Sequence, residues 1–384
     1  IMFFHTSAYA GLIGNGTSPD ISGNYYIIYS GTSPLLYNSG GTYVWLDSAV
    51  GHADYADISG DYVVTDYSAI TEPYRSNFQI YRISSGTVAY TINHGTGNHQ
   101  RPIISGNRVA WIDYTGVTTI KIYNFASGYL EKTIDNPYPA GATGNSNIDI
   151  YGNIITWSYI ESGGIKKVVY YDLSNQAQGI KYIAGGEKPR VKGNIIAFES
   201  PGIYPNITWY YISVGTLDGT NFTDGKNRRN VAVGYDKVVW EDYRWSDITP
   251  YIYYYDLPGH NVVSAQIIGG TPNIDNNRLV YYDNGKSYWA DLPGNAAPIV
   301  TDILNQTISE GGSFATIALD NYVSDANNAD STLMWNYDIY GAPNYFNVSI
   351  SAGRVATITP KNAEWGGSET ITFTANDGWA SGSD

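Results

Sequence analysis

The sequence predicts an all-β protein, a seven-bladed β-propeller followed by a smaller β-sandwich. Three observations predict it: a turn that ends in Asn or Asp recurs seven times, strand patterns repeat around each turn, and the repeat stops near residue 294. The aligned turn residues are Asn24, Asp61, Asn107, Asn153, Asn194, Asp236 and Asn277. Successive copies lie 37 to 46 residues apart, a length typical of a four-stranded propeller blade.

The turn joins the first two strands of each copy. In Gly106-Asn107 the glycine comes first and the asparagine second, which is the chemistry of a type II′ hairpin. The second strand then reads RVAWID (108–113), KVVWED (237–242) or RLVYYD (278–283). These strands are apolar on both faces, as expected for strands buried between neighbouring sheets. We therefore expect Trp111, Trp157 and Trp240 to pack between blades.

A third strand rich in tyrosine and a fourth strand complete each copy, as in VVYYDLS (168–174) and TVAYTIN (87–93). The seventh copy stops after three strands, at SYWADLP (287–293). Residues 12–24 match residues 267–277 almost position for position. We therefore expect the N-terminal segment, residues 6–14, to supply the missing strand and close the last blade, which removes exposed sheet edges.

These residues resemble the TolB-like, PD40-type propeller repeats of large archaeal and bacterial cell-surface proteins, notably those of methanogen surface layers. The resemblance covers about residues 6–294 and is carried by the Gly-Asn turn, the aromatic second strand and the Tyr-Asp-Leu third strand at 171–173 and 255–257. It implies a TolB-like seven-bladed propeller over residues 1–294 and an extracellular location at the cell surface. It implies no particular activity, because propellers host many functions.

A hinge rich in Pro, Gly and Ala (292–300) ends the repeat, and residues 298–384 predict a β-sandwich. Its expected strands are residues 301–309, 313–319, 331–339, 347–351, 354–360 and 369–377. The segments 322–335 and 371–378 resemble cadherin-like, Ig-type modules of extracellular proteins. The pattern lacks a final edge strand after residue 377, so we expect that either the natural chain continues or another molecule supplies that strand.

In calcium-binding modules of that kind, carboxylates gather at one end of the sandwich. The matching residues are Glu310, Asp325 and Asp377, with Asn327 and Asp330 nearby. Calcium takes about six to eight oxygen ligands, so three carboxylates with carbonyl groups would suffice. The alternative is that these are solvated turn residues, because Asp and Asn also favour turns and the cadherin linker motif is incomplete.

Composition excludes several classes of function. The formal net charge is −14 with only 21 Lys and Arg, which argues against a nucleic-acid partner. Without cysteine, disulfides and thiolate catalysis are excluded. No stretch approaches the roughly 18 apolar residues of a membrane helix. The apolar start up to Ala10 is typical of a signal peptide, although ring closure requires part of it.

Basic residues gather in loops that lie on one face of the predicted propeller. These loops hold Arg101, Lys188, Arg190, Lys226, Arg228, Arg229, Arg244 and Trp245. We expect a basic, aromatic rim around the central channel, which would suit acidic glycans because arginine binds carboxylates with two parallel hydrogen bonds. The alternative is that the arginines pair with Asp224, Asp242 and Asp247 in the same loops.

Five Asn-x-Ser/Thr sequons are candidate glycosylation sites, at Asn15, Asn206, Asn221, Asn305 and Asn347. The sequence contains no Gly-x-Ser-x-Gly elbow, His-Glu-x-x-His motif or phosphate loop. We therefore expect no catalytic activity, and no cofactor other than calcium in the C-terminal module. Paired carboxylates for glycoside hydrolysis stay open, because such pairs converge in space and not in sequence.

Two functions remain open. The first is a non-enzymatic structural or adhesive protein of the cell envelope, a subunit of a surface layer, sheath or filament that associates with itself or with other envelope proteins. The resemblance, the modular tail and the acidity favour it. The second is a secreted carbohydrate-binding or carbohydrate-active protein that uses the basic loop face on acidic glycans.

Overall fold

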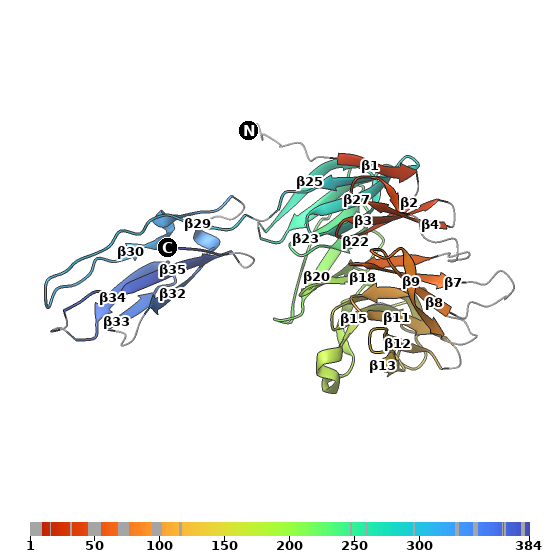
Figure 1. Cartoon of the computed structure of the whole chain (residues 1–384), viewed down its shortest axis with the longest axis horizontal. Coiled ribbons are helices and arrows are strands. Elements are labelled where there is room, and N and C mark those ends of the chain that lie inside the picture. Colours follow the sequence, from red (N-terminus) through yellow and green to blue (C-terminus); the bar gives the residue numbers. More distant parts are fainter. Residues whose placement is uncertain are drawn as a thin grey trace. The chain divides into compact units, whose positions relative to one another are not determined.

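The computed structural model describes residues 10–15, 17–30, 33–44, 55–67, 77–93, 102–114, 117–245, 248–258, 260–294, 296–326, 330–340, 345–362, 364, 366–377 and 381–384. These residues are mostly strand and form two compact units (Figure 1). The first holds residues up to Tyr255 together with Val262–Pro293, and the second holds Asp256–Asn261 and Gly294–Asp384. No helix among the described residues is long and apolar enough to span a membrane.

The described part of the first unit contains seven sheets of four strands, numbered sheet 1 to sheet 7 in chain order. Sheet 1 is β2 (Thr17–Ser22), β3 (Tyr25–Ser30), β4 (Ser33–Asn38) and β5 (Tyr43–Val44); sheet 2 is β6 (Ala56–Ser59), β7 (Tyr62–Tyr67), β8 (Asn77–Arg82) and β9 (Thr87–Asn93). Sheet 3 is β10 (Ile103–Ser105), β11 (Arg108–Asp113), β12 (Thr119–Asn124) and β13 (Tyr129–Asp135).

Sheet 4 is β14 (Thr143–Tyr151), β15 (Ile154–Ile160), β16 (Lys166–Asp172) and β17 (Lys181–Gly185), with the short 3-10 helix η1 (Leu173–Gln178) before its last strand. Sheet 5 is β18 (Glu187–Lys192), β19 (Ile195–Glu199), β20 (Ile207–Tyr211) and β21 (Thr216–Gly219). Sheet 6 is β22 (Arg228–Val233), β23 (Lys237–Asp242), β24 (Tyr251–Asp256) and β25 (Asn261–Ile268). Sheet 7 is β26 (Gly270–Asp275), β27 (Arg278–Asp283), β28 (Lys286–Asp291) and β1 (Ala10–Asn15).

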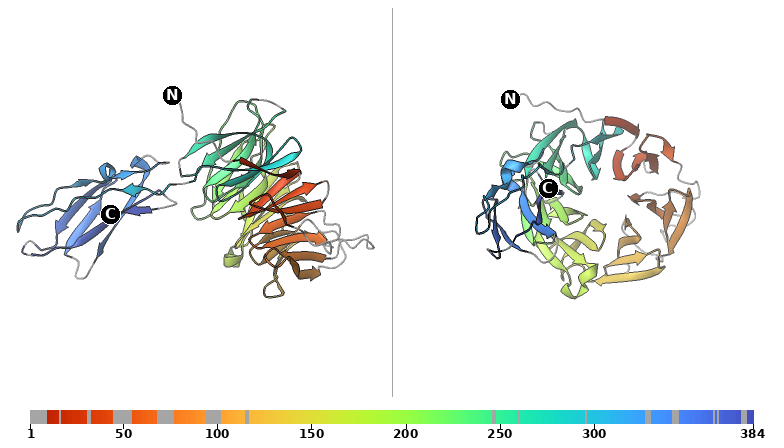
Figure 2. Two further views of the ribbon diagram at one scale, coloured as in Figure 1. Left: turned by 45° about the horizontal axis from the view of Figure 1, so that its top comes forward. Right: turned by 60° about the vertical axis from the view of Figure 1, so that its left-hand side comes forward.

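The sheets follow one another around a ring, the arrangement of a β-propeller (Figure 2, right). Sheet 7 takes its outer strand from the other end of the unit, because β1 pairs antiparallel with β28. Leu12 lies opposite Tyr288 and Asn15 lies opposite Lys286. The expected closure by the N-terminal segment is therefore confirmed for Ala10–Asn15, while residues 6–9 lie outside the described residues.

The turn between the first two strands has the predicted backbone. In Gly23, Gly60, Gly106, Gly152 and Gly193 the φ angle lies between 56° and 59°. The following Asn or Asp is not in the left-handed region, and a positive φ at only the first turn position is the pattern of type II′. In sheet 7 the same position is Asn276, with φ 52°.

The serine of the repeated Ile-Ser-Gly-Asn segment ties each of the first sheets to the next. Its hydroxyl oxygen accepts the N–H of the following sheet's turn glycine: Gly60 to Ser22 at 2.8 Å, Gly106 to Ser59 at 2.9 Å and Gly152 to Ser105 at 3.0 Å. Across the closing joint, the carboxylate of Asp275 accepts the N–H of Gly23 at 2.6 Å. The recurring Ser-Gly pair is therefore a joint between sheets.

The second strands form the buried layer, as their apolar pattern predicts. Every residue of β23 is buried. Trp111 meets Phe78 of the neighbouring sheet edge to face, with ring centroids 5.3 Å apart. Trp157 packs in a cluster shared by sheets 3 and 4, which confirms that these two tryptophans lie between blades. Trp240 is also fully buried, and its ring stacks on Tyr253 of its own sheet.

The second unit contains short strands around one apolar core that includes Leu319, Leu333 and Phe373. Its elements are β29 (Ile299–Val300), β30 (Ile317–Ala318), η2 (Leu319–Tyr322), β31 (Val323–Ser324), η3 (Asp330–Thr332), β32 (Met334–Tyr340), β33 (Phe346–Ile350), β34 (Val355–Pro360), β35 (Thr370–Asn376) and β36 (Ser381–Ser383). The described strands pair as β29 with β31, as β30-β34-β33 and as β32-β35-β36.

Two expectations for this unit are wrong. Residues 301–309 do not form a strand. Within this stretch the side-chain amide of Gln306 bonds both the N–H and the carbonyl of Ala315. The last residues do form an edge strand where the pattern predicted none: β36 pairs with β35, and Phe373 and Asp384 exchange two backbone hydrogen bonds.

Candidate functional site

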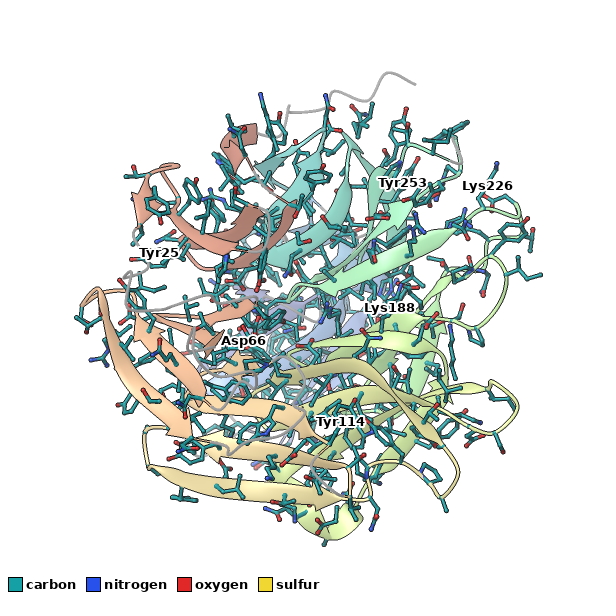
Figure 3. All side chains as sticks on the ribbon, turned by 90° about the vertical axis from the view of Figure 1, so that its right-hand side faces the viewer. Tyr25, Asp66, Tyr114, Lys188, Lys226 and Tyr253 are labelled. Atoms are coloured by element: carbon teal, nitrogen blue, oxygen red, sulfur yellow. The ribbon has the colours of Figure 1, made fainter. Side chains whose placement is uncertain are left out.

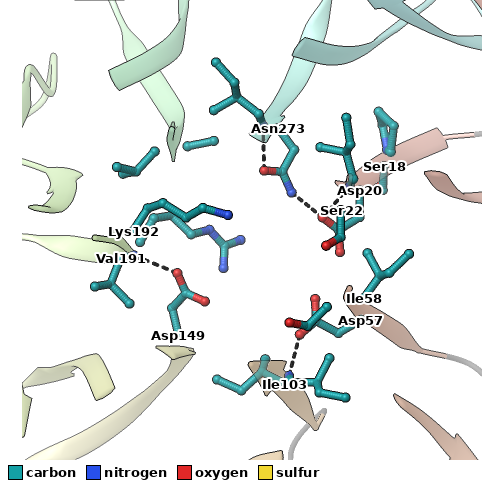
Figure 4. A pocket seen from close by; sticks show the side chains of 18 of the residues that line it. Ser18, Asp20, Ser22, Asp57, Ile58, Ile103, Asp149, Val191, Lys192 and Asn273 are labelled. Carbon is teal, nitrogen blue, oxygen red and sulfur yellow. Dashed lines mark hydrogen bonds between the residues drawn. The ribbon is translucent and has the colours of Figure 1, made fainter. Parts of the chain in front are cut away.

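The first strands of the seven sheets surround a cavity of about 830 Å³. Aligning the sheets on their turns shows that the residue four positions before the turn Asn or Asp lines this cavity in every sheet. These residues are Asp20, Asp57, Ile103, Asp149, Arg190, Ala232 and Asn273 (Figure 4). Five of the seven are polar or charged, so the described lining of the cavity is rich in groups that can bind a polar ligand.

Backbone N–H groups fix the three carboxyl groups of the cavity in place. Asp57 accepts the N–H of Ile104 from sheet 3 at 2.7 Å, and Asp149 accepts the N–H of Val191 from sheet 5 at 2.8 Å. Asp20 accepts its neighbour's N–H at 2.8 Å and the side-chain amide of Asn273 from sheet 7. Each carboxyl group therefore joins or faces a neighbouring sheet, as the dashed lines in Figure 4 show.

Asp20 and Asp57 line the same cavity and act on each other's ionisation. Burial raises the pKa of Asp57 well above its ordinary value, and the charge of Asp20 raises it further. Burial also raises the pKa of Asp20. The two carboxyl groups therefore titrate as a pair and not independently.

Burial likewise raises the pKa of Asp149, although the charge of Arg190 opposes it. Burial acts to lower the pKa of Arg190, but the charge of Asp149, then that of Tyr55, outweighs it, so this pKa is raised. Asp149 and Arg190 therefore act on each other in the same cavity as the Asp20–Asp57 pair.

A bulge at the entry of the first strand shapes one end of the cavity. Ser18, Lys188, Asn230 and Thr271 stand six positions before the turn Asn or Asp, line the cavity and have φ between 47° and 54°. The register of the first strand shifts beside each of them. Bulges of this kind re-aim side chains, which explains how four unlike residues meet the same cavity end.

The residues of the predicted basic rim do not lie together: some line the central cavity, and others lie farther from the middle of the ring. Lys188 and Arg190 were expected in a loop, but they belong to β18 and line the cavity. Lys226 lies farther from the middle of the ring than Lys188 does (Figure 3). Arg101 lies outside the described residues.

The arginines near sheet 6 largely follow the alternative interpretation. Arg228 is only 1% exposed and contacts Asp224 at 2.6 Å and Asp242 at 3.1 Å, so it cannot reach a ligand. Arg244 contacts Asp242 at 2.6 Å. The predicted ligand role of these two arginines is therefore corrected to an ion-pair network in which one carboxylate meets both cations.

Near sheet 6, two residues of the predicted rim are exposed. Arg229 has a side chain that is 47% exposed, although it donates to the Tyr243 hydroxyl and faces Glu241 at 3.5 Å. Trp245 is 73% exposed and donates its ring N–H to Tyr253.

The predicted calcium ligands do not form a metal-binding cluster. No group of three or more His, Cys, Asp or Glu among the described residues is placed to hold a metal ion, and Glu310, Asp325 and Asp377 are all described. They follow three separate segments of the second unit: the extended stretch after β29, β31 and β35. The nearby Asp330 lies in η3, and Asn327 is outside the described residues.

Four of the five sequons have an exposed asparagine, namely Asn15, Asn221, Asn305 and Asn347. The fifth, Asn206, is half-buried and donates its side-chain amide to the carbonyl of Phe222 at 3.1 Å. The nitrogen that would carry a glycan is therefore engaged, and Asn206 is corrected to a structural residue.

Sequence reasoning missed Asp20, Asp57, Asp149 and Asn273. A signal for them was present, because all four stand at the same offset before an aligned turn. It was hidden by the apolar residues at the same offset in sheets 3 and 6.

No protein-family model matches the sequence, and no curated protein matches it. Solved structures similar in fold include the WD40 repeats of RRP9, at 9% identity over 70% of this chain and 91% of that one, with a TM-score of 0.49. BamB from Moraxella catarrhalis is 13% identical over 74% of this chain and 99% of that one, with a TM-score of 0.42. TolB from Acinetobacter baumannii is 13% identical over 72% and 79% of the two chains, with a TM-score of 0.38. At these values the similarities say nothing about activity, ligand or partner.

Proposed function

We propose that this protein is a non-enzymatic scaffold of the cell exterior, a structural or adhesive subunit of a surface layer, sheath or filament. In this proposal the ring is a seven-bladed TolB-like propeller and the second unit is an Ig-like or cadherin-like module. The observation that carries the proposal is the use of polar side chains around the channel as joints between sheets: Ser22, Ser59, Ser105, Asp57, Asp149 and Asp275 each accept a backbone N–H from a neighbouring sheet.

A ring tied in this way suits a rigid element that holds partners at fixed positions. The net charge of −14 and four exposed sequons are compatible with an exterior surface. The resemblance of the repeats to those of archaeal surface-layer proteins supports the proposed location, and self-association or binding to other envelope proteins is the proposed partnership.

Immunogold electron microscopy on intact cells of the source organism tests this proposal. The expected result is dense labelling of the cell exterior, together with an ordered array in isolated envelope material. Labelling that appears only after the cells are opened would contradict it. Sedimentation of the purified chain adds a second readout, because a strictly monomeric protein with no envelope association also counts against a scaffold.

Acidic-glycan binding is the second candidate, and the exposure of Trp245 and Arg229 favours it. The Arg229 guanidinium lies over the ring of Tyr243, 4.6 Å from its centroid, and the exposed Trp245 adds a second aromatic ring. Such groups would suit a sugar ring bearing a carboxylate. A glycan array that includes uronic-acid polymers tests it with the parent and an Arg229→Ala, Trp245→Ala variant. Binding by the parent that the variant loses is the expected result, and equal signals from the two would contradict it.

A further inference from the structure

Three cations of β18 lie at alternate positions along the cavity, and they differ in their partners. Lys188 contacts Glu199 at 3.0 Å and Lys192 contacts Asp275 at 2.8 Å. Arg190, between them, takes part in none of the hydrogen bonds and ion pairs among the described residues, and its side chain is exposed to the cavity. Its planar group with five N–H donors therefore faces the cavity without a protein acceptor.

Three carboxyl groups line the same cavity as Arg190. Asp149, Asp20 and Asp57 act on its charge, and backbone N–H groups hold all three carboxyls in fixed directions. A carboxylate has about four acceptor positions, so these fixed groups retain acceptor capacity toward the cavity. The cavity thus contains the guanidinium of Arg190 as a donor, and carboxyl oxygens held in fixed positions as acceptors.

The hydrogen-bonding groups of the cavity select the kind of ligand. Arg190 offers donors to the cavity, and the oxygens of Asp20, Asp57 and Asp149 offer acceptors. A ligand with only a carboxylate would bring no donor to these acceptors, and a ligand with only a cationic group would leave the guanidinium unpartnered. A molecule with one carboxylate and one ammonium group meets both needs.

We propose that the central cavity binds a small zwitterion of the amino-acid class. Arg190 binds its carboxylate through two parallel hydrogen bonds, and the carboxylates of Asp149 and Asp20 accept its ammonium group. A cavity of about 830 Å³ is within the range of small-molecule pockets and leaves room for a side chain and water. The proposal does not depend on the exterior location, so a negative localisation result leaves it standing.

Isothermal titration calorimetry of the full chain tests the proposal with named probes. The probes are glycine, β-alanine, 4-aminobutyrate and 6-aminohexanoate, in which the distance between the two charges increases, together with acetate, ethylammonium and D-galacturonate. We expect at least one of the amino acids to bind with a Kd of about 0.1 mM or tighter, and the singly charged probes to bind far more weakly. Absence of binding by every amino acid, or equal binding of D-galacturonate, overturns the proposal.

Matched variants assign the binding to Arg190. Arg190→Gln should weaken the best amino acid by at least about 30-fold, because a buried charge of the ligand loses its partner. Arg82→Gln is the control, since Arg82 lies outside the cavity, half-exposed and beside Asp61, and should bind as the parent does. Arg190→Lys keeps the positive charge but cannot form two parallel hydrogen bonds, so it should bind with intermediate affinity. This variant tests the proposal even if Arg190→Gln does not fold. Parent-like affinity in Arg190→Gln or Arg190→Lys overturns the proposal.

Discussion

Sheets 1 to 3 and sheets 4 to 7 differ in the residue that stands two positions before the turn Asn or Asp, and therefore in how this position connects one sheet to another. In the first three sheets a serine two residues before the turn Asn or Asp accepts one N–H from the next sheet. In the other four sheets that position holds Tyr151, Lys192, Gly234 and Asp275. The Lys192 ammonium lies 2.8 Å from Asp275 and over the rings of Tyr151 and Tyr235, at 5.1 and 5.2 Å from their centroids.

The serines connect pairs of adjacent sheets, whereas Lys192 connects three sheets through one side chain. Each serine connects two adjacent sheets and nothing else, so the serine joints should contribute independently. Lys192 contacts side chains from sheets 4, 6 and 7 at once, and the Tyr151 and Tyr235 hydroxyls are also hydrogen-bonded to each other. One residue therefore stabilises several joints of the second half.

The largest effect is expected for Lys192→Met. It removes the cation from a mostly buried pair and leaves Asp275 charged, which should lower the free energy of unfolding by about 2–3 kcal/mol. Urea unfolding of the full chain measures it, and Asp275→Asn added to Lys192→Met should recover part of the loss. Lys166→Met, at a more exposed pair with Glu187, is the control with a cost under about 0.5 kcal/mol, and equal costs in the two variants would contradict the shared joint.

A smaller effect is expected at the turn glycine. Gly106 has φ 56° and no atom within 4 Å of an added Cβ, so Gly106→Ala should cost about 1–2 kcal/mol through backbone strain alone. Gly106→Asn should cost less, because Asn276 occupies the same turn position with φ 52°. Urea unfolding distinguishes them, and a larger loss in the Asn variant would show that space and not φ sets the cost.

A single serine joint should contribute least of these three. Ser59→Ala leaves the N–H of Gly106 without its acceptor at an exposed position, so we expect a loss of about 0.5–1 kcal/mol. The same change at Ser22 and Ser105 should add to it, because the joints are separate. A triple variant that loses clearly more than the three single variants together would show that the first half of the ring is also coupled.

Asp57→Asn produces an effect that depends on pH. The folded-state pKa of Asp57 is raised, so its protonated form stabilises the ring below the unfolded pKa, and this stability is lost as pH rises through the folded pKa. The groups that act on Asp57 and Arg190 in this cavity are Asp20, Asp149, Tyr55 and each other. Asparagine keeps an acceptor for the N–H of Ile104 and stays neutral at every pH.

Unfolding of Asp57→Asn and of the parent at pH 5 and pH 8 measures the difference. The variant should gain stability relative to the parent as pH rises. The same difference at both pH values would show that Asp57 is already ionised at pH 5 in the folded ring, and would contradict the raised pKa.

Much of the ring could be predicted because its signals are local. The strands β11, β23 and β27 begin and end where the apolar runs do, and the Gly-Asn order predicts the observed turn. Closure by β1 was visible in the match between residues 12–24 and 267–277. In the second unit, residues 301–309 have a strand composition but are not paired as a strand. Their contact with residue 315 is made by the side chain of Gln306, which a local apolar pattern does not predict.

The site was less predictable because it is assembled from residues that lie far apart. Asn273 donates to Asp20 across 253 positions of sequence, and only the closed ring brings them together. The arginines of sheet 6 were misassigned for a related reason: the positions of Asp224 and Asp242 around Arg228 decide whether it is a ligand-binding residue or a buried ion-pair member.

The closed ring underlies both the joints and the cavity, and a designed disulfide tests it most directly. Asn15 lies opposite Lys286 in the pairing of β1 with β28, and the chain contains no cysteine, so Asn15→Cys with Lys286→Cys introduces the only two thiols. The closed ring predicts an intramolecular cross-link in nearly all monomers on mild oxidation, and none when the second cysteine is placed at Asp291 at the far end of β28. Cross-linking between molecules alone, or equal cross-linking of the two pairs, would contradict the closed ring.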